Sequence, residues 1–247
     1  MAHHDTHDTV EEAGFVVGVD GCKRGWIAAE LEKQRHLIAF RTFSTFADLL
    51  GAYPESTIIG VDVPIGLSTD GGRICDGLAR KRLGFPRSSS VFSAPDRRIL
   101  GCATYDEANA MSKKLTAKGI SRQTFGIMAK IAEVDAAMTS ALQGRVIEVH
   151  PEVSFWAINH EQPMSHSKKR VAGFEERRST LLTEFPHISL PATRPVLKAM
   201  ACGVPADDAL DAVIAAWSAH RFAKGISISL PDSPEIDSRD LAMAITY

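Results

Sequence analysis

Two short apolar runs, each ending in an aspartate, constrain the fold of this chain more than any other feature. The first, 15-FVVGVDG-21, ends at Asp20, and the second, 57-TIIGVDVP-64, ends at Asp62. Both are rich in β-branched residues and bounded by glycine or proline, which predicts two buried strands. A carboxylate beside a buried strand is costly unless it is paired, solvated or metal-bound. Ligands bind beyond the carboxyl ends of strands in open α/β sheets, so the recurrence favours one shared site over two independent turn caps.

The neighbouring runs predict the rest of a mixed sheet. The segments 25-GWIAAEL-31 and 36-HLIAFRTF-43 follow the first strand at short spacing and complete an antiparallel meander. A short helix capped by Ser44 or Thr45 then leads into the second buried strand, which we expect to run parallel to the first. A further strand is predicted at 145–151.

The remaining segments are predicted to be mainly helical. We expect helices over 73–83, 104–118, 121–142, 170–185 and 206–224. The first three fall in a helical insertion, about 70–144, between two strands of the sheet. Residues 1–13 are polar, rich in histidine and aperiodic, which predicts a disordered tail. No internal repeat or low-complexity linker divides the rest, so we predict a single domain over 14–247.

The composition indicates a soluble cytoplasmic protein. No apolar stretch approaches the ~20 residues that span a bilayer, which argues against a membrane partner. No basic region followed by an apolar run opens the chain, as a secretory signal would. The four cysteines stand far apart, which fits reduced thiols better than disulfides or a zinc site.

The net charge of −2 hides an uneven distribution. Residues 73–130 carry twelve lysines and arginines against four acidic residues, a net charge of +8, so the remainder carries −10. An acidic body with a basic segment suits a protein that binds a polyanion through metal ions and a cationic flank. Solvated helix faces would produce the same distribution.

Two more regions supply carboxylates. Glu148 lies in the predicted strand within EVHPE, and His150 and Glu152 either reach the same crevice or cap a helix that begins near residue 151. Asp208 and Asp211 are spaced by three residues, which places them one turn apart on one face of the predicted helix 206–224. Hard oxygen ligands without cysteine or paired histidine favour Mg²⁺ or Mn²⁺ over zinc.

Seven groups of motifs follow one another along the chain: VGVDGCKRGW, VDVPIGL, SSSVFSAPDRRIL, GISRQTFGI with KIAEVD, EVHPEVSFW, SKKR with GFEERR, and DDALDA. In this order they resemble the family catalogued as domain of unknown function number 429, which is described as predicted RNase H-like nucleases. They run from about Val16 to Gly225. The resemblance implies an α/β fold of the RNase H-like kind, with three antiparallel and two parallel strands flanked by helices.

The same resemblance implies roles for the acidic residues. Asp20 would be the first-strand acid, Asp62 the fourth-strand acid, and Asp211 with Asp208 the last-helix acid. The DALD sequence at 208–211 is similar to an Asp-x-x-Asp pair of Holliday-junction resolvases. We therefore expect a metal-dependent phosphodiester hydrolase, acting on nucleic acid or on a phosphorylated small molecule.

In a two-metal site, ions ~4 Å apart activate a water and stabilise the departing oxygen. Asp20 would bridge them, with Asp62 and Asp211 or Asp208 holding one ion each, and Glu148 would be a fourth ligand or orient the water. The substrate-binding candidates are Arg73, Lys81, Arg87, Arg97 and, through a neutral hydrogen bond, Gln123. A second basic cluster, 168-KKR-170, is explained equally well by a solvated surface.

Two rival functions keep the same fold. An ATP-dependent phosphotransferase is disfavoured, because the turn 20-DGCKRGW-26 has no hydroxyl residue and the chain has no P-loop. A non-catalytic binding module is the second rival. The three tryptophans, Trp26, Trp156 and Trp217, each lie among apolar neighbours and are expected in the core rather than on a stacking surface.

Overall fold

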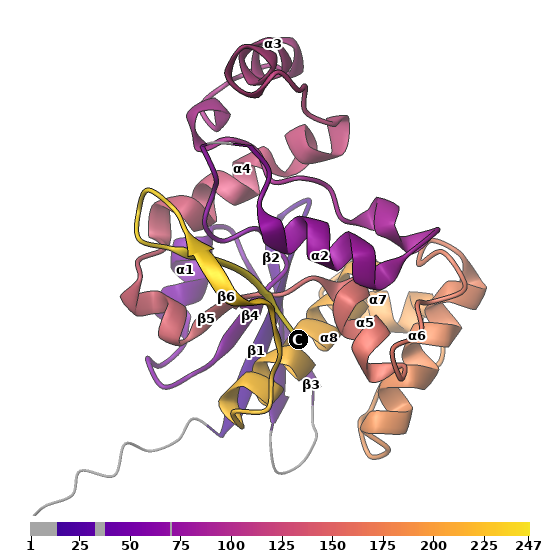
Figure 1. The fold of residues 1–247 in the computed structure, drawn as a ribbon. Helices are drawn as coiled ribbons and strands as arrows, with labels where there is room; N and C mark the ends of the chain where they lie inside the picture. The colour runs from indigo at the N-terminus through magenta and orange to yellow at the C-terminus, as the bar shows by residue number, and fades with distance from the viewer. Residues whose placement is uncertain (1–13, 33–37, 70) are drawn as a thin grey trace, which may run out of the picture.

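A computed structural model of the chain describes residues 14–32, 38–69 and 71–247. The expected tail, 1–13, lies outside the described residues. A five-stranded sheet forms the centre (Figure 1). Its strands are β1 (Phe15–Cys22), β2 (Gly25–Glu32), β3 (Ile38–Phe43), β4 (Ile59–Val61) and β5 (Val146–Glu148).

The strand order is β3-β2-β1-β4-β5. The β1–β2 and β2–β3 pairs are antiparallel, whereas β1–β4 and β4–β5 are parallel. The predicted mixed sheet of three antiparallel and two parallel strands is therefore confirmed, including the parallel pairing of the strand that carries Asp20 with the strand that precedes Asp62. Its parallel strands put their carboxyl ends at the same edge.

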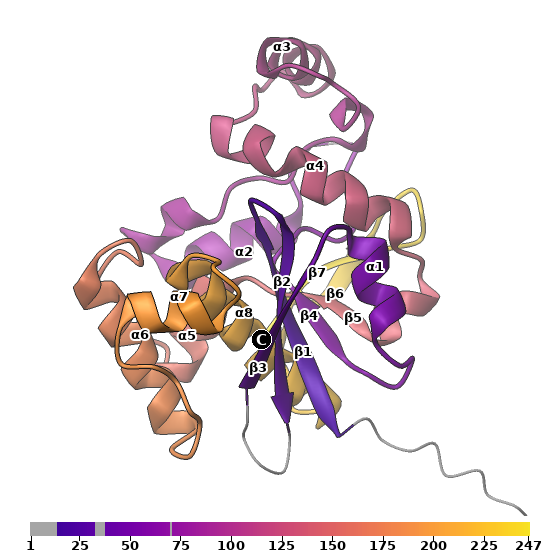
Figure 2. The same ribbon diagram turned by 180° about the vertical axis from the view of Figure 1, so that it is seen from behind.

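Helices cover both faces of the sheet (Figures 1 and 2). Side chains alternate along β1, so Val17 and Val19 belong to the core shared with α1 (Phe46–Ala52) and α4 (Arg122–Ala137), while Val16 faces the other way. The core on that second side includes α5 (Pro151–Ile158) and α8 (Ala206–Ala223). Trp26, Trp156 and Trp217 are buried as predicted.

Glycines let α8 lie directly against the sheet. A Cβ atom on Gly18 of β1 would lie 2.0 Å from the Ala212 carbonyl oxygen and 2.1 Å from the Ala216 amide nitrogen. A Cβ on Gly60 of β4 would lie 2.7 Å from the Ala215 carbonyl oxygen. Such distances leave no room for any side chain, so this packing fixes the position of α8 over β1 and β4.

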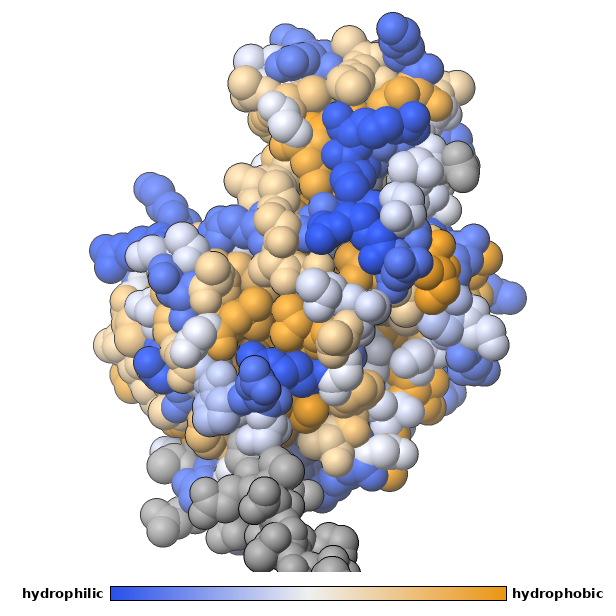
Figure 3. All heavy atoms as spheres, turned by 90° about the vertical axis from the view of Figure 1, so that its left-hand side faces the viewer, coloured by the Kyte–Doolittle hydropathy of each residue, from blue (hydrophilic) through white to orange (hydrophobic). Residues whose placement is uncertain are grey.

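The predicted insertion contains α2 (Ile74–Leu83), α3 (Tyr105–Thr116) and α4. The α3–α4 part rises as a narrow lobe above the main body (Figure 3). The helix expected over 121–142 is shorter than predicted, because Met138 is extended. The Thr139 hydroxyl accepts the amide proton of Leu142 at 3.2 Å, and such local bonds compete with a continuing helix.

The C-terminal part of the chain adds α6 (Val171–Glu184), α7 (Arg194–Met200) and a hairpin of β6 (Ser229–Ile236) and β7 (Ala242–Thr246). The hairpin and α7 were not predicted. Two prolines interrupt β6, which hides the strand pattern in the sequence. Within the described ranges, no helix is long and apolar enough to cross a membrane.

Candidate metal centre

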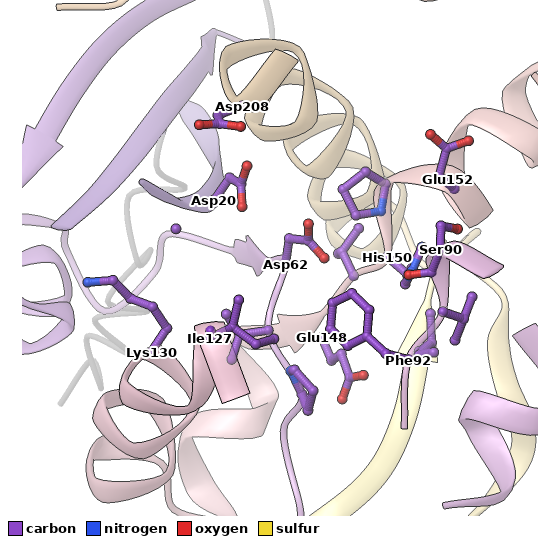
Figure 4. Close-up of a pocket in the computed structure, with 18 of the residues that line it drawn as sticks. Asp20, Asp62, Ser90, Phe92, Ile127, Lys130, Glu148, His150, Glu152 and Asp208 are labelled. Atoms are coloured by element: carbon purple, nitrogen blue, oxygen red, sulfur yellow. The ribbon is translucent and has the colours of Figure 1, made fainter. Parts of the chain in front are cut away.

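Three aspartates converge at the carboxyl edge of the parallel strands. Asp20 lies near the carboxyl end of β1, Asp62 follows β4, and Asp211 lies on α8. One carboxylate oxygen from each lies within 4.8 Å of the other two. Figure 4 shows the carboxylates of Asp20 and Asp62 facing the same space, with Asp208 beyond Asp20. The predicted grouping of first-strand, fourth-strand and last-helix acids is thus present in the structure.

The local fold explains why these residues meet. Gly18 and Gly60 are paired in the parallel register of β1 and β4. Asp20 and Asp62 each come two residues later, and alternation along a strand places them on the same face as the glycines. The helix that packs on those glycines carries Asp211 directly before Ala212, the first of its residues in contact with Gly18. The same close packing that fixes α8 therefore delivers the third carboxylate.

Burial and mutual repulsion disfavour the charged forms of these carboxylates. Burial, followed by the charges of Asp62 and Asp211, raises the pKa of Asp20 well above its ordinary value. Burial and the charge of Asp211 raise the pKa of Asp62 to about 8. A divalent cation among the three would favour their ionised forms, and an all-oxygen donor set fits Mg²⁺ or Mn²⁺.

Asp207 and Asp208, at the start of α8, have different surroundings. Asp208 lines the cleft next to the cluster, and burial with the charge of Asp207 raises its pKa to about 6. Asp207 instead accepts a short hydrogen bond from Lys169 and lies 3.5 Å from the guanidinium of Arg194. Asp208 is therefore available to the site, whereas Asp207 is engaged outside it.

Lys168 contacts the carboxylate cluster. The ammonium of Lys168 donates a short hydrogen bond to Asp211, whose side chain exposes only 1% of its surface. The charge of Asp211, followed by those of Asp20 and Asp62, raises the pKa of Lys168 above its ordinary range. Of the 168-KKR-170 cluster, Lys168 thus belongs to the site rather than to a merely solvated surface.

Asp20, Asp62 and Asp208 form part of the wall of a cleft of about 730 Å³. At one end lie Lys130 and the turn after β1, and at the other lie Ser90, His150 and Glu152 (Figure 4). Sequence reasoning did not single out Lys130 for the site. It stacks over the Trp26 ring at 4.6 Å and bonds Glu133 three residues later, and that helical i,i+3 spacing was the only available signal.

Glu148 and Arg73 both line the cleft, and the structure pairs them with each other. Both oxygens of Glu148 accept hydrogen bonds from the Arg73 guanidinium, at 2.6 and 2.7 Å, and one also accepts the amide proton of Ile65 at 2.7 Å. Arg73 is buried and also bonds Asp76 at 2.6 Å. With its donors held by these carboxylates and by backbone carbonyls, Arg73 is not placed to bind phosphate, and Glu148 lies outside the three-aspartate set.

The other substrate-binding candidates are spread over the molecule. Arg87 lines the cleft and donates to the carbonyls of Met164 and Ser165 at 2.6 and 3.0 Å. Arg97 is not among the lining residues of the cleft and bonds Asp135 at 2.9 Å. Lys81 and Gln123 are exposed and also lie outside the lining. The basic segment therefore does not act as one surface, because several of its arginines form internal ion pairs.

His150 and Glu152 both line the cleft, as one of the two sequence interpretations held. His150 occupies the N-cap position of α5, but its side chain does not cap the helix. Its Nε2 lies 3.4 Å from the Ser90 carbonyl oxygen. One oxygen of Glu152 accepts a short hydrogen bond from Arg177, which anchors α6 to α5.

Comparisons with known proteins bear on the family. Neither a comparison with curated proteins nor one with solved structures gave a match. A family model described as "Protein of unknown function (DUF429)" matches residues 18–236, which include Asp20, Asp62 and Asp211. This match covers most of the chain, and the chain therefore belongs to the DUF429 family.

Proposed function

We propose that this protein is a divalent-metal-dependent phosphodiester hydrolase. The observation that carries the proposal is the convergence of Asp20, Asp62 and Asp211 within 4.8 Å, with Asp20 and Asp62 on the wall of a cleft. Three acidic side chains from three separate elements are costly to bring together unless they have a ligand in common. The oxygen-only donor set makes Mg²⁺ or Mn²⁺ the preferred ligand.

The residues of the cleft would have separate roles in metal binding and substrate binding. Asp20, Asp62 and Asp211 would hold one ion, and Asp208 supplies a further carboxylate where a second ion would be held. When bound, Mg²⁺ or Mn²⁺ acts as a Lewis acid on a phosphoryl oxygen and makes water a better nucleophile. Lys130 lies on the cleft wall and would bind the phosphate of the substrate.

A cleavage panel with Mn²⁺ tests this function. The substrates are single-stranded DNA, duplex DNA, RNA, an RNA–DNA hybrid, a four-way junction and a small aryl phosphodiester. Wild type should cleave at least one of them, and Asp20→Asn should reduce that rate by at least about 10²-fold. Asp207→Asn is the matched control, since Asp207 lies on the same helix but pairs with Lys169. Equal rates for wild type and Asp20→Asn on every substrate would contradict the proposal.

Salt dependence separates a nucleic acid from a small substrate. A nucleic-acid substrate that contacts several phosphates should lose affinity steeply as salt rises, because binding releases counterions. A small phosphodiester should give a nearly flat response. Fluorescence anisotropy in 50 to 200 mM salt, with Ca²⁺ replacing Mn²⁺ to slow cleavage, gives the slope.

A further inference from the structure

We propose that Lys168 is a resident cation of the carboxylate cluster, which a divalent ion must displace from Asp211 in order to bind. This inference rests on the proposed metal site and extends it to a residue that the hydrolase proposal does not use. Lys168 would therefore set the affinity of the site for metal, by competing for one of its ligands.

The first argument is charge. Asp20, Asp62 and Asp211 gather three carboxylates in one place, and Asp208 adds a fourth nearby. Lys168 interacts electrostatically with all four of these aspartates, and its ammonium is hydrogen-bonded to the most deeply buried one. A monovalent cation already in this position lowers the free energy of the metal-free cluster, and a divalent ion has to replace that stabilisation.

The second argument is geometry at Asp211. Its side chain exposes 1% of its surface, and one of its two oxygens accepts the hydrogen bond of the Lys168 ammonium. The Lys168 side chain exposes 34%, so it has a route to solvent when it leaves. Competition is therefore direct, since the two cations require the same buried carboxylate.

The third argument is that the backbone next to Lys168 is fixed. The amides of Ser165 and His166 donate to Glu176 at 2.7 and 2.9 Å, and Arg177 donates to the His166 carbonyl at 3.0 Å. On the other side of Lys168, Arg194 donates to the Lys169 carbonyl at 2.7 Å. Displacement therefore requires only rotation of the Lys168 side chain, and the released ammonium remains at the cleft, within reach of an anionic substrate.

Lys169 provides a matched control for the test. It is the next residue, carries the same charge and also forms a short ion pair with an aspartate of α8. Its partner Asp207 lies outside the three-aspartate set. Removing either lysine changes the net charge of the protein by the same amount, so a difference between the two variants isolates direct competition.

The experiment is a Mn²⁺ titration by calorimetry on the full chain, without substrate. Lys168→Met should tighten Mn²⁺ binding by about tenfold or more, since the competing charge is removed. Lys169→Met should change the affinity by less than about threefold, and Lys168→Arg, which keeps the charge, should bind like wild type. Thermal unfolding in EDTA checks folding. Lys168→Met should melt below wild type there and show a larger Mn²⁺-induced rise in Tm, because Asp211 then lacks its cation.

The outcomes distinguish this inference from the function it rests on. If wild type binds Mn²⁺ and Lys168→Met binds it equally or more weakly, Lys168 is not a competitor, while the metal site stands. If Lys168→Met binds Mn²⁺ and wild type does not, Lys168 excludes the ion from the wild-type site and the inference is supported. If none of the folded variants binds Mn²⁺, both the metal site and the competition are overturned.

Discussion

At the scale of single residues, the cluster is defined by carboxylates that oppose one another's ionisation. Asp20 and Asp62 are raised in pKa chiefly by burial and then by neighbouring aspartates. The Glu148–Arg73–Asp76 group is also buried, and there one arginine is shared by two carboxylates. In the aspartate cluster, by contrast, Lys168 is shared by four carboxylates, so negative charge is in larger excess there.

The titration of Asp62 predicts a pH dependence of stability in the metal-free protein. Its folded-state pKa of about 8 lies above the ordinary value of 3.8, so the folded state binds the proton more tightly than the unfolded state. This contribution to stability is complete at acidic pH and is lost as the pH rises toward 8, by at most about 1.4 kcal/mol per pH unit. Urea denaturation in EDTA between pH 5 and 8 measures it. Asp62→Asn should show a shallower decline than wild type, and an identical decline would refute the assignment.

Arg73 gives a second prediction at this scale. Arg73→Met leaves the buried Glu148 and Asp76 carboxylates without their cation, so it should lower the free energy of unfolding by about 3–5 kcal/mol. Lys81→Met, on the exposed side of the same helix, should change it by no more than about 0.5 kcal/mol. Chemical denaturation of both variants decides the point. A fully stable Arg73→Met that binds substrate poorly would restore the phosphate-binding role expected from the sequence.

At the scale of elements, the contact between α8 and the sheet determines the site. Gly18→Ala would place a Cβ 2.0 Å from the Ala212 carbonyl oxygen, so α8 must move away from β1. The expected loss is about 1–3 kcal/mol or more of stability, together with weaker Mn²⁺ binding, because Asp211 moves with the helix. Thermal unfolding and calorimetry measure the two effects.

Gly51→Ala is the control for that substitution. A Cβ at Gly51 meets nothing within 4 Å, and the residue lies in α1. Alanine should therefore leave stability unchanged or raise it by up to about 1 kcal/mol, through its higher helix propensity. Similar losses for both variants would show that close packing of α8 is not the cause.

At the scale of the whole molecule, the hairpin β6–β7 is tied to the region after β4 through Asp237. Its carboxylate accepts the amide protons of Leu67, Arg239 and Leu241, and it pairs with Arg97. Asp237→Ala should lower the free energy of unfolding by about 2–4 kcal/mol. Amide hydrogen exchange should then rise in the β6–β7 hairpin more than in the five-stranded sheet. Exchange that rises uniformly over the whole chain would contradict this local role.

The sequence predicted the sheet and the acidic cluster because both follow local patterns. An aspartate that closes an apolar β-branched run can be recognised without knowledge of its partners, and the spacing of Asp208 and Asp211 is visible on one helix. Partner choice among charged residues is different, because it depends on side chains far apart in the sequence. Arg73 resembles a solvated base in the sequence, and only the folded chain brings it to Glu148, 75 positions away.

The position of α8 also has a consequence for synthesis of the protein. Asp20 and Asp62 leave the ribosome before Asp211, which follows almost 150 residues after Asp62. A nascent chain that ends before α8 has two of the three carboxylates and lacks the helix that packs against Gly18 and Gly60. The capacity to hold an ion should therefore arise only after α8 has been synthesised, in the step that also completes the core around β1.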